Sequence, residues 1–192
     1  MRAAACIVAL SLLTCTPRTY VADTANSPPT VPVFVDSRFT GETKGAIRLA
    51  IDEWNIALGN HLRFYVDSET FERPSHDPIV DLSRLWTDSL GVTIDWEPPD
   101  CLHCRWTNDI AWVSAIGGTD IHLVMSRADA WDVKAIIEHE FGHVLGLEHT
   151  AEPDELMTTY LEHQARCIDA DTVAQVAKVH GWEVTRMVSL CP

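Results

Sequence analysis

Residues 139–149 read HEFGHVLGLEH, and the spacing of the three histidines decides how the rest of the chain is interpreted. At about 100° per residue, His139 and His143 lie on one face of a helix, about 6 Å apart along its axis, so both imidazoles can reach one ion. Gly146 tolerates a left-handed backbone, which allows the helix to end and the chain to turn back. His149 can then return as a third ligand, and the stretch predicts a metal site.

Glu140 completes the pattern H-E-x-x-H-x-x-G-x-x-H. It is too close in sequence to His139 to be a comfortable fourth ligand, but it can hold a water molecule on the metal. Three neutral imidazole nitrogens leave the fourth tetrahedral position of zinc open for that water, which is typical of a catalytic rather than a structural site. With average residue usage, the fixed positions match by chance in fewer than about one chain in a thousand. The sequence therefore favours a catalytic zinc site over a chance pair of surface histidines.

At these positions the sequence resembles the metzincin metallopeptidases, and among them the matrixin-like branch. Every fixed position of the long motif matches, and Met157 follows His149 by eight residues, as the methionine of the matrixin methionine turn does. Residues 118–123, GTDIHL, are similar to the segment that leads into the edge strand of a matrixin's upper domain, and residues 168–182 are similar to the family's last helix. Taken loosely, the resemblance covers residues 30–182.

The resemblance implies an α+β fold of the zincin, or metzincin, type: a twisted mixed β-sheet of about five strands, an active-site helix and a C-terminal helix. It implies one catalytic Zn2+ held by His139, His143 and His149, with Met157 in the structural turn beneath the metal. Glu140 would be the general base of a zinc-dependent endopeptidase that acts on a peptide or protein substrate. A matrixin holds its substrate by adding it as a strand to an edge strand. That role is assigned to Asp120, Ile121, His122, Leu123 and Val124.

Some features depart from the matrixin pattern. The sequence shows no propeptide of the cysteine-switch type. His122 keeps one position of the matrixin structural-metal loop, but the partner histidines and aspartates are not found. An additional structural zinc or calcium is therefore not expected, and His122 is interpreted as a strand residue. Tyr160 follows Met157 by three residues, so the metal-directed role of a tyrosine two residues after that methionine is not carried over.

The bulk composition fits one acidic domain. The chain has 192 residues, 46% of them hydrophobic, which is enough for a core of its own. Its 14 basic residues against 28 acidic ones give a formal net charge of -14. Such a charge argues against nucleic acid or an anionic membrane surface as the partner. We expect a monomer whose partner is its peptide or protein substrate.

The amino end is interpreted as an export signal. Residues 1–15 carry one early positive charge and a short apolar run, which is too short to span a bilayer as a helix. The sequence LLTC at residues 12–15 resembles a bacterial lipobox, in which Cys15 would become the lipid-bearing first residue; a plainly secreted protein is the alternative. Residues 16–32 are rich in Pro, Thr, Ser and Ala and predict a flexible tether. The catalytic domain is expected at residues 33–192, in a secreted, periplasmic or cell-surface protein.

Cysteine counting agrees with export. If the signal is cleaved off and Cys15 carries the lipid, four cysteines remain: Cys101, Cys104, Cys167 and Cys191. An even number in an oxidising compartment favours two disulfides, with three pairings open. The pairs Cys101 with Cys104 and Cys167 with Cys191 are favoured, because the second would staple the tail beyond the last helix. The alternative is that Cys101 and Cys104 form half of a structural zinc site, although a second C-x-x-C is missing.

Hydrophobic periodicity and turn residues predict the remaining elements. The expected strands are residues 33–36, 61–66, 91–96, 110–116 and 120–125, and the expected helices are residues 42–58, a zinc helix capped near Asp129, and residues 169–180. The last of these strands is expected at the edge of the sheet, over the cleft. Residues 67–90 give no clear pattern, with residues 79–90 as a short helix or an irregular insertion. Trp112 and Trp131 are candidates to line the cleft, and the primary-specificity pocket is expected between the zinc helix and residues 162–169.

Two other functions compete with the peptidase. One is a secreted or surface zinc-binding protein without turnover, such as an adhesin, but a site of that kind has no use for Glu140. The other is a purely structural zinc domain, which would close the fourth position with a protein ligand. No obvious ligand of that kind follows His149. Both alternatives are weaker than zinc-dependent hydrolysis of peptide bonds.

Overall fold

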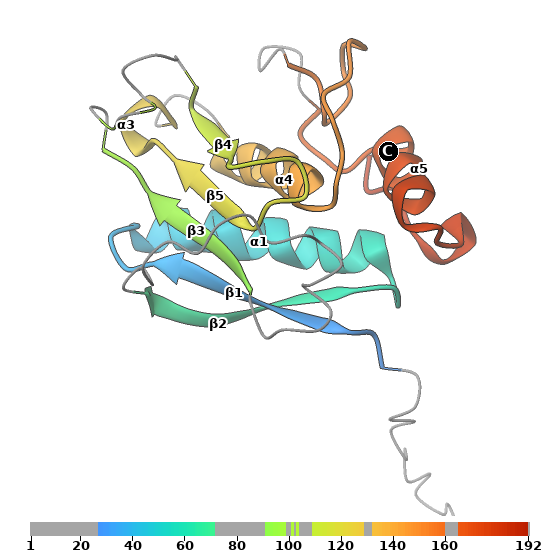
Figure 1. Ribbon diagram of the computed structural model, residues 1–192, viewed down its shortest axis with the longest axis horizontal. Coiled ribbons are helices and arrows are strands. Elements are labelled where there is room, and N and C mark those ends of the chain that lie inside the picture. The colour runs from blue at the N-terminus through green and yellow to red at the C-terminus, as the bar shows by residue number, and fades with distance from the viewer. Residues whose placement is uncertain are drawn as a thin grey trace, which may run out of the picture.

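The computed structural model describes the following residues: 27–71, 91–98, 101, 103, 109–128, 132–159 and 165–191. The elements follow in this order: β1 (Thr30–Asp36), α1 (Gly41–Leu58), β2 (Arg63–Phe71), β3 (Val92–Trp96), β4 (Ala111–Val113), β5 (Asp120–Leu123), α3 (Met125–Ala128), α4 (Val133–Val144), α5 (Ala170–His180) and the 3-10 turn η3 (Val184–Arg186). Figure 1 shows α1 and α4 behind the sheet and α5 to one side of it.

The sheet has five strands in the order β2-β1-β3-β5-β4. β1 pairs in parallel with both β2 and β3, and β3 pairs in parallel with β5, whereas β4 runs antiparallel to β5. The predicted strand, helix, strand pattern at the amino end is confirmed, because β1 and β2 are parallel and α1 connects them. This mixed sheet with its helices is the α+β architecture that the resemblance implied.

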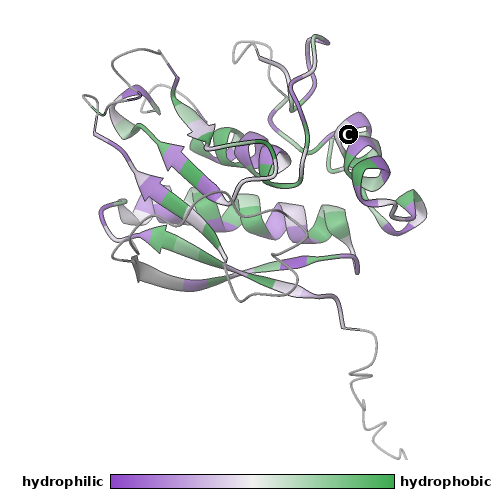
Figure 2. Ribbon diagram, viewed as in Figure 1, coloured by the Kyte–Doolittle hydropathy of each residue, from purple (hydrophilic) through white to green (hydrophobic). Residues whose placement is uncertain are grey.

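Helix α1 forms as the sequence predicts. Its first turn is capped by Thr40, whose side chain accepts a hydrogen bond from the Thr43 backbone N–H, and it ends at Gly59, where φ is 59°. The residues at helical spacing point into the core, and Ile47 and Leu58 have no exposed surface. Figure 2 shows the resulting alternation of apolar and polar segments along the helix and the strands. Amphipathic periodicity with a cap at each end is therefore sufficient to specify this element.

The core lies between the sheet and the two helices behind it. Trp54 of α1, Phe64 of β2 and Phe141 of α4 are almost fully buried. The rings of Phe64 and Phe141 meet edge to face with their centroids 4.9 Å apart, and Trp54 Nε1 donates a hydrogen bond to the Glu138 carbonyl oxygen at 3.0 Å. Burial of a side chain of this size stabilises the fold by about 1.5–3 kcal/mol. These contacts fix α4, which carries the first two motif histidines, against α1 and the sheet.

Two predicted strand boundaries are wrong. β1 begins at Thr30, inside the stretch predicted as a tether, and β2 continues to Phe71 instead of ending at residue 66. The proline-rich composition was misleading because Pro32 lies in β1 opposite Tyr65, while pairing of β1 with β3 begins only at Val33. A proline at such a position removes one N–H without breaking a ladder on both sides.

The predicted position of residues 120–125 at the sheet edge is also wrong. β5 lies between β3 and β4, and the edge strand is β4. The residues assigned to substrate binding, Asp120, Ile121, His122, Leu123 and Val124, therefore belong to an interior strand and the residue after it, and all but Asp120 are buried. Alternation along a strand reports which side chains face the core, but strand order depends on pairing between distant segments. The shorter strand β4 covers only three of the predicted residues 110–116.

The C-terminal part of the chain matches the prediction closely. Helix α5 is capped by Asp169, whose side chain accepts from the Thr172 backbone N–H, and it ends at Gly181 in the left-handed conformation. Cys167 and Cys191 form a disulfide beyond this helix, which confirms one favoured pair. Cys101 is also disulfide-bonded, but the predicted pair includes Cys104, which lies outside the described residues.

Several other predictions fall outside the described residues. They concern the export signal, Tyr160, Trp131 and the helix or insertion at residues 79–90. Within the part of the chain that the structure describes, no helix is both long enough and apolar enough to cross a membrane.

Candidate metal centre

Helix α4 positions the first two motif histidines. It begins after Asp132, whose carboxylate accepts hydrogen bonds from the backbone N–H groups of Lys134 and Ala135 at 3.1 and 3.4 Å. The predicted cap near Asp129 is therefore wrong by about one turn, because the residue that caps the helix is Asp132. The inner face of the helix carries Ile137, Phe141 and Val144, which are fully buried.

The end of α4 turns the chain back toward the metal ligands. Gly146 has φ 87°, as the motif requires. The Leu147 backbone N–H then bonds to the Gly142 carbonyl oxygen at 3.0 Å, which closes the last turn. In this way His149 returns to the side of the helix that carries His139 and His143.

Backbone carbonyls orient two of the three imidazoles. His139 Nδ1 lies 2.7 Å from the Leu156 carbonyl oxygen, and His143 Nδ1 lies 2.8 Å from the Leu147 carbonyl oxygen. A carbonyl oxygen can only accept, so Nδ1 carries the proton in both rings and donates. In the neutral tautomer each Nε2 is then a bare lone pair. Hydrogen bonds of this type are the usual orienting partners of metal-ligating histidines.

The three Nε2 atoms converge on one point. His149 Nε2 lies 3.2 Å from Nε2 of His139 and 3.2 Å from Nε2 of His143. Zinc–nitrogen bonds of 2.0–2.1 Å give an edge of about 3.3–3.4 Å between two ligands of a tetrahedron. The Nε2 atoms of His139 and His143 are unprotonated, so only that of His149 can carry a proton. Without a cation, at least two nitrogen lone pairs would therefore face one another. The residues present therefore fit a tetrahedral cation held by three neutral nitrogens.

Burial keeps these ligands neutral. Burial and, after it, the neighbouring charge of His143 lower the pKa of His139 to about 3. Burial also lowers the pKa of His143 and of His149 from their ordinary value. A metal competes with protons for the same lone pairs, so a lowered pKa prepares the site for metal binding at neutral and mildly acidic pH.

Glu140 faces the same cleft. Its side chain is buried, and its Oε2 has no hydrogen-bond partner among the described residues. Burial, followed by the negative charge of Asp109, raises the pKa of Glu140 to about 8. A dication held by the histidines would favour the ionised carboxylate and oppose this shift. A cation bound to the histidines would therefore set the charge state of Glu140.

The predicted methionine turn lies directly against α4. Met157 is fully buried, and a Cβ added to Gly142 would lie 2.3 Å from its Sδ. The Met157 carbonyl oxygen also accepts a hydrogen bond from the Thr150 N–H at 2.9 Å. Asp169 supports the turn from α5, because its Oδ2 accepts from the Leu156 N–H at 2.8 Å. The motif alone did not mark Gly142, although a glycine in a helix interior is a signal of close approach.

A cleft of about 570 Å³ opens beside the three histidines. One wall is residues 109–113 together with Ile116, and the other is α4 with Ile136 and the motif side chains; Thr158 and Thr159 complete it. The prediction that Trp112 lines the cleft is confirmed. Sequence reasoning missed Thr158 and Thr159, since nothing in their pattern distinguishes them from other loop residues.

His122 lies away from the three motif histidines, and both of its ring nitrogens have protein partners. Its Nδ1 lies 2.9 Å from Glu97 Oε1, and its Nε2 lies 3.2 Å from Ser114 Oγ. Its ring stacks on Trp112 with a centroid distance of 4.9 Å. These contacts tie β3, β5 and β4 together behind the cleft wall.

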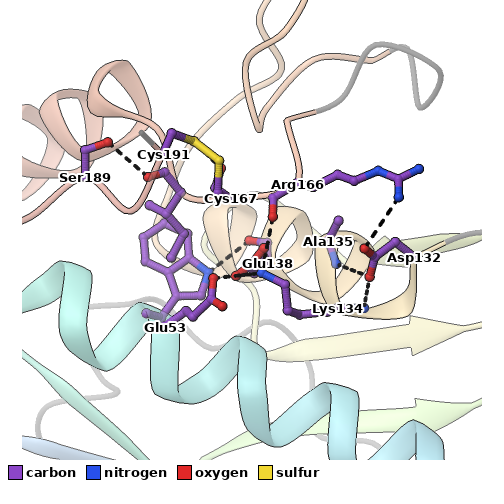
Figure 3. A network of polar contacts seen from close by, with 11 residues as sticks. Glu53, Asp132, Lys134, Ala135, Glu138, Arg166, Cys167, Ser189 and Cys191 are labelled. Atoms are coloured by element: carbon purple, nitrogen blue, oxygen red, sulfur yellow. Dashed lines mark hydrogen bonds and ion pairs between the residues drawn. A yellow bond between two sulfur atoms is a disulfide. The ribbon is translucent and has the colours of Figure 1, made fainter.

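A partly buried charge network joins α4 to α1 (Figure 3). Lys134 Nζ contacts Glu53 Oε2 at 2.7 Å, Glu138 Oε1 at 2.9 Å and the Arg166 carbonyl oxygen at 3.2 Å. Glu138 directly precedes the first motif histidine and has no exposed surface. Burial and, after it, the contact with Glu53 raise the pKa of Glu138 to about 8. The network joins α1, α4 and the segment that leads to Cys167. In the sequence, only the i,i+4 spacing of Lys134 and Glu138 indicates an ion pair of this network.

The fold and the three converging imidazoles define a metallopeptidase of the zincin type. The matrixin family model matches residues 37–181, which is well over half of the chain. The chain therefore belongs to the matrixin family. No curated protein sequence gives a significant match.

Solved structures show the same fold at low sequence identity. Metalloproteinase-II from Bacteroides fragilis is similar with a TM-score of 0.50 and 15% identity, over 80% of this chain and 54% of that one. Archaemetzincin from Methanopyrus kandleri is similar with a TM-score of 0.55 and 11% identity, over 84% of this chain and 99% of that one. The chain thus spans about half the length of the Bacteroides protein, and both likenesses concern the fold alone.

Proposed function

We propose that this protein is a zinc-dependent endopeptidase with Glu140 as its general base. The observation that carries the proposal is the meeting of three imidazole Nε2 atoms and one buried carboxylate in a single cleft. A carboxylate with an unpartnered buried oxygen is costly unless it has a task. A site that only stored zinc would not need it.

The side chains divide the reaction between them. His139, His143 and His149 would hold the zinc ion. When bound, zinc supplies Lewis-acid polarisation of the scissile carbonyl and a lowered pKa for a coordinated water. Glu140 accepts the proton of the attacking water and passes it to the leaving amine. Glu140 itself is buried, so its charge interacts strongly with the groups around it.

The edge strand β4 supplies a platform for the substrate backbone. The Val124 N–H donates to the Ile110 carbonyl oxygen, and the Ser114 N–H donates to the Asp120 carbonyl oxygen. In an antiparallel ladder, the intervening Ala111 and Val113 then turn their N–H and C=O groups toward the open side. An extended peptide can pair with those groups as an added strand. This mode binds the interior of a chain, which supports an endopeptidase.

A pair of substitutions tests the proposal. Glu140→Ala should retain one equivalent of zinc but lose hydrolysis of casein by about a hundredfold or more, because only proton transfer is removed. His143→Ala should lose both zinc and activity. Zinc content by atomic absorption and casein cleavage with and without chelator are the readouts. Activity that survives in Glu140→Ala would contradict its role as the general base. A wild-type protein that binds zinc and cleaves nothing would favour the zinc-binding protein without turnover.

We also propose that the protein acts outside the cytoplasm. Support comes from the Cys167–Cys191 disulfide, since such bonds persist mainly in oxidising compartments. The lipid attachment proposed at Cys15 can be checked by mass spectrometry of the membrane fraction.

A further inference from the structure

Asp109 places a carboxylate at the wall of the cleft. Among the described residues that line the cleft, Asp109 and Glu140 are the acidic ones, and lysine and arginine are absent. Most of the other residues along the β4 wall are apolar, including Ile110 and Val113. We propose that Asp109 makes this peptidase selective for substrates with a lysine or arginine side chain at one fixed position near the scissile bond. The inference rests on the proposed peptidase function.

The Asp109 side chain is held in place and remains accessible. Its Oδ2 lies 2.8 Å from His103 Nε2, and its side chain is 48% exposed. The His103 ring stacks on Trp112 with a centroid distance of 4.2 Å, and Arg127 Nη1 donates to the Asp109 carbonyl oxygen at 2.9 Å. A carboxylate accepts at about four lone-pair sites. It can therefore receive a substrate ammonium or guanidinium group in addition to its protein partners.

Asp109 lies in the same cleft as the reacting centre. It lines this cleft together with Glu140 and the three motif histidines. A cationic side chain bound at Asp109 would therefore lie close to the scissile bond. The net charge of -14 on the whole chain also attracts cationic substrates from a distance.

The other end of the β4 wall has a different character. Ile116 lines the cleft there and is 52% exposed. A strand rises about 3.4 Å per residue, so the wall from Asp109 to Val113 extends over about four residues of a paired peptide. Within this stretch of the wall, only Asp109, at one end, carries a carboxylate. The preference is therefore expected at a single substrate position, instead of for basic peptides in general.

The experiment uses peptides that share one scissile bond and carry lysine, norleucine or glutamate at each flanking position in turn. With the zinc-loaded wild type, kcat/KM for lysine should exceed that for norleucine by about five- to tenfold at one position. In Asp109→Asn this ratio should fall to about one. Glu152→Gln, which removes an exposed carboxylate outside the cleft lining, should keep both the ratio and the activity.

Salt dependence provides a test that needs no variant. In the wild type, raising salt to about 0.5 M should shrink the lysine preference but not the preferences at apolar positions, because screening weakens only the charge pair. No lysine preference at any position, or an equal preference in Asp109→Asn, would overturn the inference while leaving the peptidase in place. Failure of the folded, zinc-loaded wild type to cleave any peptide would overturn the proposed function itself, and this inference with it.

Discussion

Gly142 lies between the two helical metal ligands at the point where α4 meets the methionine turn. Alanine is a better helix former than glycine by about 1 kcal/mol. An added Cβ, however, would lie 2.3 Å from Met157 Sδ and 3.0 Å from its Cε. Overpacking of a filled core costs about 1–3 kcal/mol. The steric effect therefore outweighs the propensity, and this glycine is required for close approach.

We predict that Gly142→Ala lowers the free energy of unfolding by about 1–2 kcal/mol. In a Met157→Ala background the same change should be neutral or stabilising, because the obstructing side chain is gone.

Gly45→Ala is the matched control, since Gly45 lies in α1 with nothing within 4 Å of an added Cβ. It should raise stability by up to about 1 kcal/mol. Urea denaturation of the four variants measures all these values, and an equal cost of Gly142→Ala in both backgrounds would contradict the contact.

At the scale of elements, α5 supports the end of α4. His180 Nε2 donates to the Leu145 carbonyl oxygen at 2.9 Å, and the His180 ring stacks on Trp182 with a centroid distance of 4.3 Å. Leu145 caps α4 directly before the turn that returns the third ligand. Asp169, at the other end of α5, bonds the backbone next to Met157. Both ends of α5 therefore contact segments that position the metal centre.

The contact at His180 gives a pH dependence with a defined sign. Burial lowers the pKa of His180 from its ordinary value of 6.5, and the bond to Leu145 opposes this shift only in part. Below pH 6.5 the unfolded chain binds the proton more readily than the folded one, so the contribution of His180 to stability is lost as pH falls. The stability of the wild type relative to His180→Gln should thus decrease from about pH 7 to pH 5. Denaturation of metal-free samples across this range measures the difference. A constant difference would show that the pKa is not shifted.

At the scale of the whole molecule, local patterns and long-range pairing were predictable to different degrees. α1 and α5 were predictable because their apolar spacing and caps lie within one stretch of chain. The ligand set was predictable for the same reason, since all three histidines lie within residues 139–149. Strand order was not, because β3 pairs with β1 and β5, neither of which is the strand next to it in sequence.

The surroundings of the site depended on distant contacts as well. Lys134 bonds to Glu53 across 81 positions, and no local period reports such a contact. Asp109 reaches the cleft only because β4 closes the sheet, so its proximity to the reacting centre required the structure. Sequence therefore identified the chemistry of the site, and the fold identified the residues that surround it.

X-ray absorption at the zinc edge, on protein loaded with one equivalent of zinc, tests the central claim most directly. The account predicts three imidazole nitrogens at about 2.0–2.1 Å and one further light-atom ligand that exchanges with added inhibitor or solvent. His149→Ala should lose one imidazole from this shell. A sulfur ligand at about 2.3 Å, or a fourth side chain that closes the shell, would contradict a catalytic centre.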